Sequence, residues 1–251
     1  MSDALDFDGL IVDLDGVVWL GAEPVPGSVE ALAELRAQGI RLAFVTNDPT
    51  GSRGHYATKL QQIGVDADDG EIMTSGSALA SLIHDREGEG KSAFVIGSPA
   101  LKRELESVGL ELRGGDAGRD AAVVAVGGHP DFDYAELRIG AQAVRRGARL
   151  YAAGRDATFP MPDGPWPATG AILAAVETAA GIRATSVGKP EPYIFESARA
   201  LLVGCRRVAV VGDHLDSDIA GGNRAGLLTI LVLTGTAMRA TLRKRQSSRT
   251  W

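Results

Sequence analysis

The stretch Gly9-Leu10-Ile11-Val12-Asp13-Leu14-Asp15-Gly16-Val17-Val18 decides the fold of this chain. Its residues 10–12 are apolar and typical of a fully buried strand. Two carboxylates follow, and the alternation of side chains along a strand predicts that Asp13 and Asp15 point to the same side at its carboxyl end. Like charges there repel each other. The stretch is therefore either a polar turn, or a place where carboxylates serve a cation or a nucleophile with an acid/base partner.

Length and composition exclude several classes of protein. The 251 residues suffice for one large domain or two, and 45% hydrophobic with 23% charged residues is typical of a globular protein. A net charge of −6 argues against nucleic acid as the main partner. The basic segment 239–249 is the exception, and we expect it to be a solvated terminal segment.

The same composition indicates a cytoplasmic protein. Cys205 is the one cysteine, which excludes an internal disulfide framework and suits a reducing compartment. No apolar run reaches the ~20 residues needed to span a membrane. The N-terminus begins with acidic residues and lacks the basic-then-apolar pattern of a signal peptide. We therefore expect that the protein is neither inserted in a membrane nor secreted.

Around the opening stretch, strands and helices alternate, which predicts a parallel sheet. The first series has a helix over 28–38, a strand over 41–45, a helix over 52–63, a strand over 71–74 and a helix over 77–84. A polar, glycine-rich break at 85–90 indicates a domain boundary. A second series follows, with strands over 93–96, 121–126 and 149–152, helices over 99–108, 133–146 and 171–180, and an irregular proline-rich stretch over 154–168. The first pattern resumes near 186, with a helix over 192–202 and strands over 207–211 and 228–233.

This order predicts an α/β protein with a Rossmann-like core at residues 1–88 and 184–251, and an α/β domain inserted at 89–183. In an open parallel sheet, ligands bind outside the carboxyl ends of the strands. Three predicted strands of the core end there in polar residues: Asp13 and Asp15, Thr46 and Asn47, and Asp213 with Asp218. Lys189 lies in a loop of the same domain. Carboxylates for a hard cation and Lys, Thr and Asn donors for a phosphate suit phosphoryl transfer.

Four ordered motifs resemble those of the haloacid dehalogenase superfamily of phosphatases. They are Asp13-Leu14-Asp15-Gly16-Val17, Val45-Thr46-Asn47, Gly188-Lys189-Pro190 and residues 211–218, Val-Gly-Asp-His-Leu-Asp-Ser-Asp. The chain looks most like the subclass with an α/β cap between the second and third motifs, which includes p-nitrophenyl, phosphoglycolate and glycerol-3-phosphate phosphatases and the NagD type. The resemblance covers nearly the whole chain.

The resemblance implies a role for each matching residue. Asp13 would be the nucleophile that forms an aspartyl-phosphate, and Asp15 would protonate the leaving group and then activate water. Lys189 would stabilise the transferred charge. Thr46 and Asn47 would bind phosphoryl oxygens. The Mg²⁺ ligands would be Asp13, the backbone carbonyl of Asp15, Asp213 and Asp218. Because dehalogenases lack the second carboxylate of the first motif, Asp15 favours a small phosphate ester as substrate.

Two places depart from the subclass pattern. Asp48 stands where a second Asn is usual, and a carboxylate there would repel substrate unless it is turned away or neutralised. In the cap, Arg155 is an unusual addition to the segment that faces substrate, and Arg155 and Asp156 are candidate substrate contacts. Two alternatives stay open: a slow phosphate-binding or regulatory protein, and a phosphomutase. Caps of this subclass often dimerise, so the resemblance also implies a homodimer through the cap.

Overall fold

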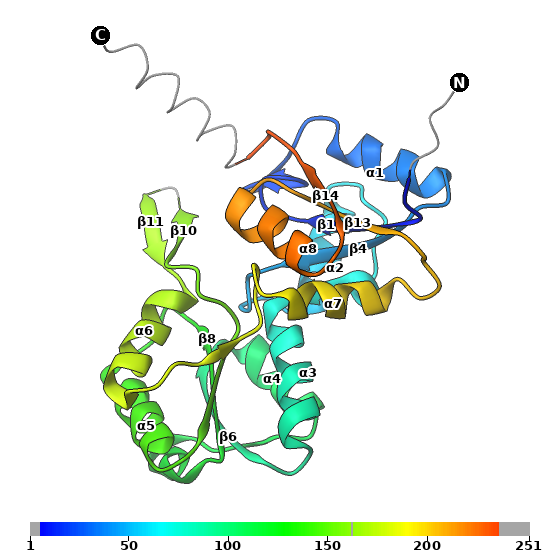
Figure 1. Ribbon diagram of the computed structural model, residues 1–251. Coiled ribbons are helices and arrows are strands. Elements are labelled where there is room, and N and C mark those ends of the chain that lie inside the picture. Colours follow the sequence, from blue (N-terminus) through cyan, green and yellow to red (C-terminus); the bar gives the residue numbers. More distant parts are fainter. Residues whose placement is uncertain (1–5, 162, 236–251) are drawn as a thin grey trace. The chain divides into compact units, whose positions relative to one another are not determined.

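The computed structural model describes residues 6–161 and 163–235, so the basic segment 239–249 lies outside the described residues. The chain forms two compact units (Figure 1). The first unit contains residues up to 46, residues 53–73 and residues from 189 onward. The second unit contains residues 47–52 and 74–188. Among the described residues, every helix is too short or too polar to span a bilayer.

A five-stranded sheet forms the centre of the first unit. Its order is β14 (Leu228–Leu231), β13 (Val208–Gly212), β1 (Gly9–Asp13), β4 (Arg41–Thr46) and β5 (Ile72–Thr74). The middle strand, β1, pairs in parallel with both β13 and β4. Because β4 and β5 lie on one side of β1 and β13 and β14 on the other, the strand order reverses at β1. A sheet with this topology has its ligand site at the carboxyl end of the middle strand.

Helices and a short ribbon complete the first unit. The helices are α1 (Ser28–Ala37), α2 (Arg53–Gln62), α7 (Pro192–Leu201) and α8 (Ala220–Arg224), and the antiparallel ribbon is β2 (Trp19–Leu20) with β3 (Glu23–Pro24). Every residue of β1 is buried, which explains its unbroken apolar sequence. Its Leu10 and Val12 pack in one core cluster with Phe44 and Trp19.

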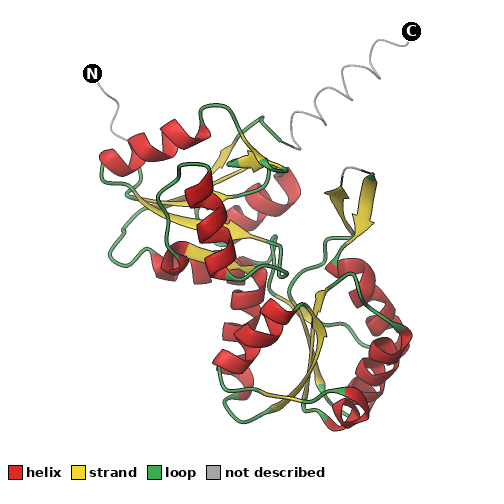
Figure 2. Ribbon diagram, turned by 180° about the vertical axis from the view of Figure 1, so that it is seen from behind, coloured by secondary structure: helices red, strands yellow, loops and turns green. Residues whose placement is uncertain are grey.

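The second unit has its own five-stranded sheet. Its order is β12 (Thr185–Ser186), β9 (Arg149–Ala152), β8 (Val123–Gly128), β6 (Ser92–Gly97) and β7 (Glu111–Leu112), with parallel pairs throughout. The helices α5 (Tyr134–Arg145) and α6 (Thr169–Ala180) cover one face, and α3 (Ser75–Glu87) and α4 (Pro99–Ser107) the other (Figure 2). The predicted fold class, a parallel-sheet α/β core with a further α/β domain, is confirmed.

Within the second unit, α3 packs on α4 and β12 pairs with β9, so the compact units divide at 73/74 and 188/189. One feature differs from the sequence-based expectation. The stretch 154–168 is not irregular: it contains an antiparallel hairpin of β10 (Thr158–Met161) and β11 (Gly164–Pro167). Prolines lack the N–H that a ladder needs, so they hide such a strand from sequence patterns.

Candidate active site

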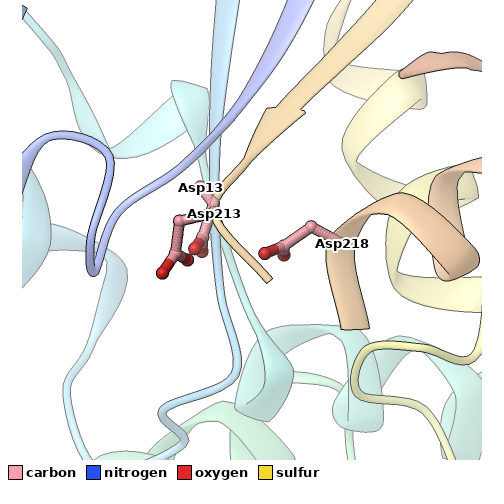
Figure 3. A group of neighbouring side chains, drawn as sticks. All are labelled: Asp13, Asp213 and Asp218. Carbon is pink, nitrogen blue, oxygen red and sulfur yellow. The ribbon is translucent and has the colours of Figure 1, made fainter. Parts of the chain in front are cut away.

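Three carboxylates meet at the carboxyl edge of the first sheet. Asp13 ends β1, Asp213 follows β13, and Asp218 lies on the π-helical turn Leu215–Ile219. One oxygen from each of the three side chains lies within 4.8 Å of the others, and all three are buried. Figure 3 shows Asp13 and Asp213 side by side, with the Asp218 carboxylate pointing toward them. The predicted convergence of the first and fourth motifs is therefore present in the structure.

Lys189 neutralises part of this negative charge. Its Nζ donates to Asp13 Oδ1 at 2.5 Å and to Asp218 Oδ1 at 2.7 Å, and its side chain is 5% exposed. The other oxygen of Asp218 accepts the N–H of His214 at 3.0 Å. A carboxylate has about four acceptor positions, so these bonds leave Asp218 able to bind a cation as well.

The charges shift the pKa values of the buried groups. Burial lowers the pKa of Lys189, but Asp13 and Asp218 outweigh burial and raise it, so the ammonium stays charged. Burial and the neighbouring Asp218 raise the pKa of the Asp13 carboxyl, while Lys189 opposes them. The Asp13 carboxyl therefore keeps a raised pKa although the Lys189 ammonium lies beside it.

Glycines allow this close packing. Gly16 has φ +86°, and a Cβ on it would lie 2.5 Å from Asp213 Oδ2. A Cβ added to Gly235 would collide with the same Asp213 carboxylate, and a Cβ added to Gly212 would collide with the Cβ of Asp218. Glycine is thus required at these positions both for space and, at Gly16, for the left-handed backbone.

Asp15 lies in a different environment from Asp13. The strand β1 ends at Asp13 and the chain turns, so Asp13 is buried and Asp15 is exposed. Asp15 Oδ1 accepts a hydrogen bond from Trp19 Nε1 at 2.9 Å. Trp19 is not among the residues that the motifs single out. In the sequence, only the spacing indicates this contact: the indole N–H of Trp19 lies four residues after the Asp15 carboxylate, with a glycine turn between them.

The second motif contributes to both units. Thr46, at the end of β4, is 2% exposed, and it directly follows Val45, the register partner of Asp13. In the second unit, Asn47 Nδ2 donates to Asp156 Oδ2 at 2.7 Å. Two predicted substrate contacts, Asn47 and Asp156, therefore lie together although 109 residues separate them.

Asp48 is held in a turn. Its Oδ1 accepts the backbone N–H of Thr50 at 2.8 Å and the Thr50 hydroxyl at 2.6 Å. This side-chain turn is a common local use of aspartate. The two bonds hold one oxygen of the Asp48 carboxylate within this local turn.

Arg155 has a different partner from the one expected. Its guanidinium binds both oxygens of Glu177, at 2.8 and 3.3 Å, and the carbonyl of Ala184 at 2.9 Å. Burial raises the pKa of Glu177, but Arg155, the Ala184 N–H and Arg183 outweigh it and hold that pKa below its usual value of 4.5. The guanidinium of Arg155 is thus bound within the second unit, and its role as a substrate contact stays a prediction.

His214 and Asp216 belong to the turn that carries Asp218. His214 Nδ1 accepts the N–H groups of Asp216 and Ser217 at 3.2 and 3.3 Å and so caps this turn. The Asp216 side chain is exposed and is not part of the carboxylate cluster. Of the two carboxylates in this turn, Asp218 is the one that lies with Asp13 and Asp213.

The carboxylate cluster fits a hard divalent cation. Its donors are all oxygen, they are buried, and their charge exceeds that of the one lysine among them. Mg²⁺ prefers a small number of carboxylates and leaves positions for substrate oxygens. The residues present are thus those that a magnesium ion requires.

Comparison with known proteins agrees with this geometry. A model of haloacid dehalogenase-like hydrolases matches residues 10–111, and a second, described as HAD-hydrolase-like, matches residues 186–251. Human glycerol-3-phosphate phosphatase is 35% identical over 97% of this chain and 84% of its own length. D-glycerol 3-phosphate phosphatase of Mycobacterium tuberculosis is 36% identical over 93% of this chain and 65% of its own length.

Solved structures give the same result. The p-nitrophenyl phosphatase from Archaeoglobus fulgidus superposes with a TM-score of 0.88 and 32% identity, covering 98% of this chain and 94% of its own. A glycerol phosphate phosphatase from M. tuberculosis in complex with magnesium has a TM-score of 0.86 and 35% identity, over 92% of this chain and 68% of its own. The chain belongs to the haloacid dehalogenase-like hydrolases, and the named relatives are phosphatases.

Proposed function

We propose that this protein is a Mg²⁺-dependent phosphatase that hydrolyses small phosphate monoesters through a phospho-aspartate. The observation that carries the proposal is the buried Lys189, which bridges Asp13 and Asp218 beside Asp213. The identities of the named relatives, glycerol phosphate and p-nitrophenyl phosphatases, support the same substrate class.

Each residue has a defined task in this reaction. The Asp13 carboxylate forms a bond to phosphorus while the bond from phosphorus to the leaving oxygen breaks. Asp15 gives its proton to that oxygen, and then takes a proton from the water that attacks phosphorus. The bond from phosphorus to the Asp13 oxygen breaks in this step, which releases phosphate and restores the carboxylate. Lys189 holds Asp13 in place and balances its charge, and Thr46 and Asn47 donate to the phosphoryl oxygens.

The ligands proposed for Mg²⁺ are Asp13, Asp213, Asp218 and the backbone carbonyl of Asp15. When bound, the ion lowers the negative charge around the phosphoryl group and favours the ionised form of its ligands. Burial raises the pKa of Asp13 and so disfavours the carboxylate form that attacks phosphorus. The positive charge of a bound cation would act in the opposite direction.

We propose that the first unit is the catalytic core and the second the cap that determines substrate specificity. In the second unit, Asp156 and Asn47 are the proposed substrate contacts, and Asp48 holds the loop that carries Asn47 through its bond to Thr50. The alternative of a slow phosphate-binding protein rests on Asp48, because a carboxylate near the site can repel substrate. The bonds from Thr50 hold one oxygen of that carboxylate in a local turn, which makes the alternative weaker.

The test is phosphate release from a panel of phosphomonoesters, with Mg²⁺ and with EDTA. We expect the wild type to hydrolyse p-nitrophenyl phosphate only with the cation. Asp13→Asn keeps the side-chain shape but removes the nucleophile, so turnover is expected to vanish while the protein stays folded. Asp66→Asn, the same change at an exposed position, is the control. Near-normal turnover by Asp13→Asn would reject the proposed nucleophile.

We propose further that the protein acts in the cytoplasm as a homodimer through the second unit. The lone Cys205 supports a reducing compartment. The hairpin β10–β11 exposes Phe159, Met161 and Trp166, an apolar surface of the kind that interfaces cover. Sedimentation of the wild type and of a variant with polar residues at these three positions tests the dimer, since both would sediment alike if the hairpin were not involved.

A further inference from the structure

The first motif is followed by a tightly closed loop. The carbonyl of Leu14 accepts the N–H groups of Val17, Val18 and Trp19, at 3.3, 2.9 and 3.3 Å. The N–H of Gly16 donates to the carbonyl of Trp19 at 2.8 Å. These bonds bring Trp19 back to Asp15, so the two residues pair across the loop although four positions separate them. The backbone thus fixes where the indole lies.

The indole ring is held on several sides. Trp19 is fully buried in the core cluster of the first unit, and its backbone belongs to the ribbon β2–β3. Lys59, from α2, places Nζ 3.8 Å from the ring centroid and donates to the carbonyl of Gly21 at 3.2 Å. An ammonium over a ring attracts its electrons, which makes the indole N–H a stronger donor.

From this arrangement we infer that Trp19 is a positioning residue for Asp15, and that Lys59 supports it. The inference rests on the proposed function, in which Asp15 is the acid/base. Trp19 Nε1 binds Oδ1 of an exposed carboxylate that would otherwise rotate in solvent. The bond to Oδ1 leaves Oδ2 as the oxygen that carries the proton and passes it to the leaving group. A buried, fully packed ring holds this orientation at little cost in side-chain entropy.

The first test uses the leaving group. An alkyl oxygen needs a proton as it departs, whereas p-nitrophenolate is stable as an anion. Trp19→Phe keeps the apolar ring but removes the N–H. We expect kcat/KM for the best alkyl phosphate of the panel to fall about 10- to 100-fold, the usual effect of a misplaced catalytic group. The value for p-nitrophenyl phosphate should fall much less. Equal losses on both substrates would overturn the inference, since they indicate packing damage alone.

A double-mutant cycle with Asp15→Asn separates positioning from stability. If Trp19 acts through the acid, Trp19→Phe should lower kcat/KM for the alkyl phosphate no further once Asp15 is Asn. If Trp19 only supports the fold, the two losses should multiply, and the inference is wrong.

An activity-free measurement reads the bond directly. The indole ¹⁵N–¹H signal of Trp19, assigned with Trp19→Phe, is expected to shift upfield in Asp15→Ala in EDTA. The signal of Trp166, whose Nε1 donates to Asp163 at 2.8 Å, is the internal reference and should not move. An unmoved Trp19 signal would show that the bond is absent. This result is independent of catalysis, so it distinguishes failure of the inference from failure of the proposed phosphatase activity.

Discussion

Replacing Lys189 with methionine tests the charge balance of the candidate active site. Methionine is similar in length and apolar, so the change removes the ammonium while largely keeping the volume. The side chains of Asp13 and Asp218 are 7% and 1% exposed, so both lose their cation in a place that water hardly reaches. Breaking a buried pair from one side costs about 3–5 kcal/mol. For a chain of this size, each kcal/mol lowers Tm by about 2–4 °C, so the expected drop is about 6–20 °C.

The assay is thermal unfolding in EDTA, followed by circular dichroism. Lys91→Met, the same change at an exposed position, is the matched control and should leave Tm nearly unchanged. A Tm of Lys189→Met close to the wild-type value would refute the reasoning, because it would mean that the carboxylates do not depend on this ammonium.

The pH dependence of the same variant has a definite sign. Burial and Asp218 already raise the pKa of Asp13, and removing Lys189 raises it further. Because the folded-state pKa of Asp13 is raised, its ionised form lowers the free energy of unfolding at pH values above 3.8, the ordinary pKa of the carboxyl. Protonation of Asp13 at low pH restores that free energy. The Tm deficit should therefore be larger at about pH 8 than at about pH 5. A deficit independent of pH would point to packing instead of charge.

Three further predictions concern the cation site and the second unit. Asp213→Ala should raise the Mg²⁺ concentration needed for activity sharply and the exposed Asp216→Ala should not; the reverse order in a Mg²⁺ titration would move the site. Gly16→Ala should weaken Mg²⁺ binding measured by calorimetry, because its Cβ would displace the Asp213 carboxylate and its φ is +86°. Glu177→Gln should cost about 1.5–3 kcal/mol at neutral pH through the lost bonds to Arg155. Because the folded-state pKa of Glu177 is depressed, this deficit should disappear as pH falls below 4.5, and a deficit that persists in acid would contradict the prediction.

The regular elements were predictable because their signals are local. The unbroken apolar run of β1 indicates a strand buried on both faces, and the structure has it so. The helix α5 begins after Asp133, whose side chain caps it by accepting the N–H of Glu136 at 2.8 Å, as the spacing of these two residues predicts. Such signals depend on neighbours within one turn of helix or strand.

The features that the sequence does not indicate arise where the partner is distant or the local signal misleads. In the hairpin, Pro160 and Pro165 occupy paired positions, and proline is a signal against a strand. Arg155 carries a charge suited to an anionic ligand, but its partner is a buried carboxylate 22 residues away on α6. Local sequence does not specify which anion such a side chain meets.

By itself, the sequence determined the order of strands and helices and the polar residues at which the strands end. Backbone preference and apolar period act over a few residues, so the chain already carries that information. Only the tertiary structure decided that Lys189 lies between Asp13 and Asp218, which are 176 and 29 residues away along the chain. It also placed Trp19 against Asp15. The contacts of Lys189 and Trp19 depend on which strands become neighbours in the sheet and on how a loop closes. Burial then makes each unpaired charge costly enough to select one arrangement.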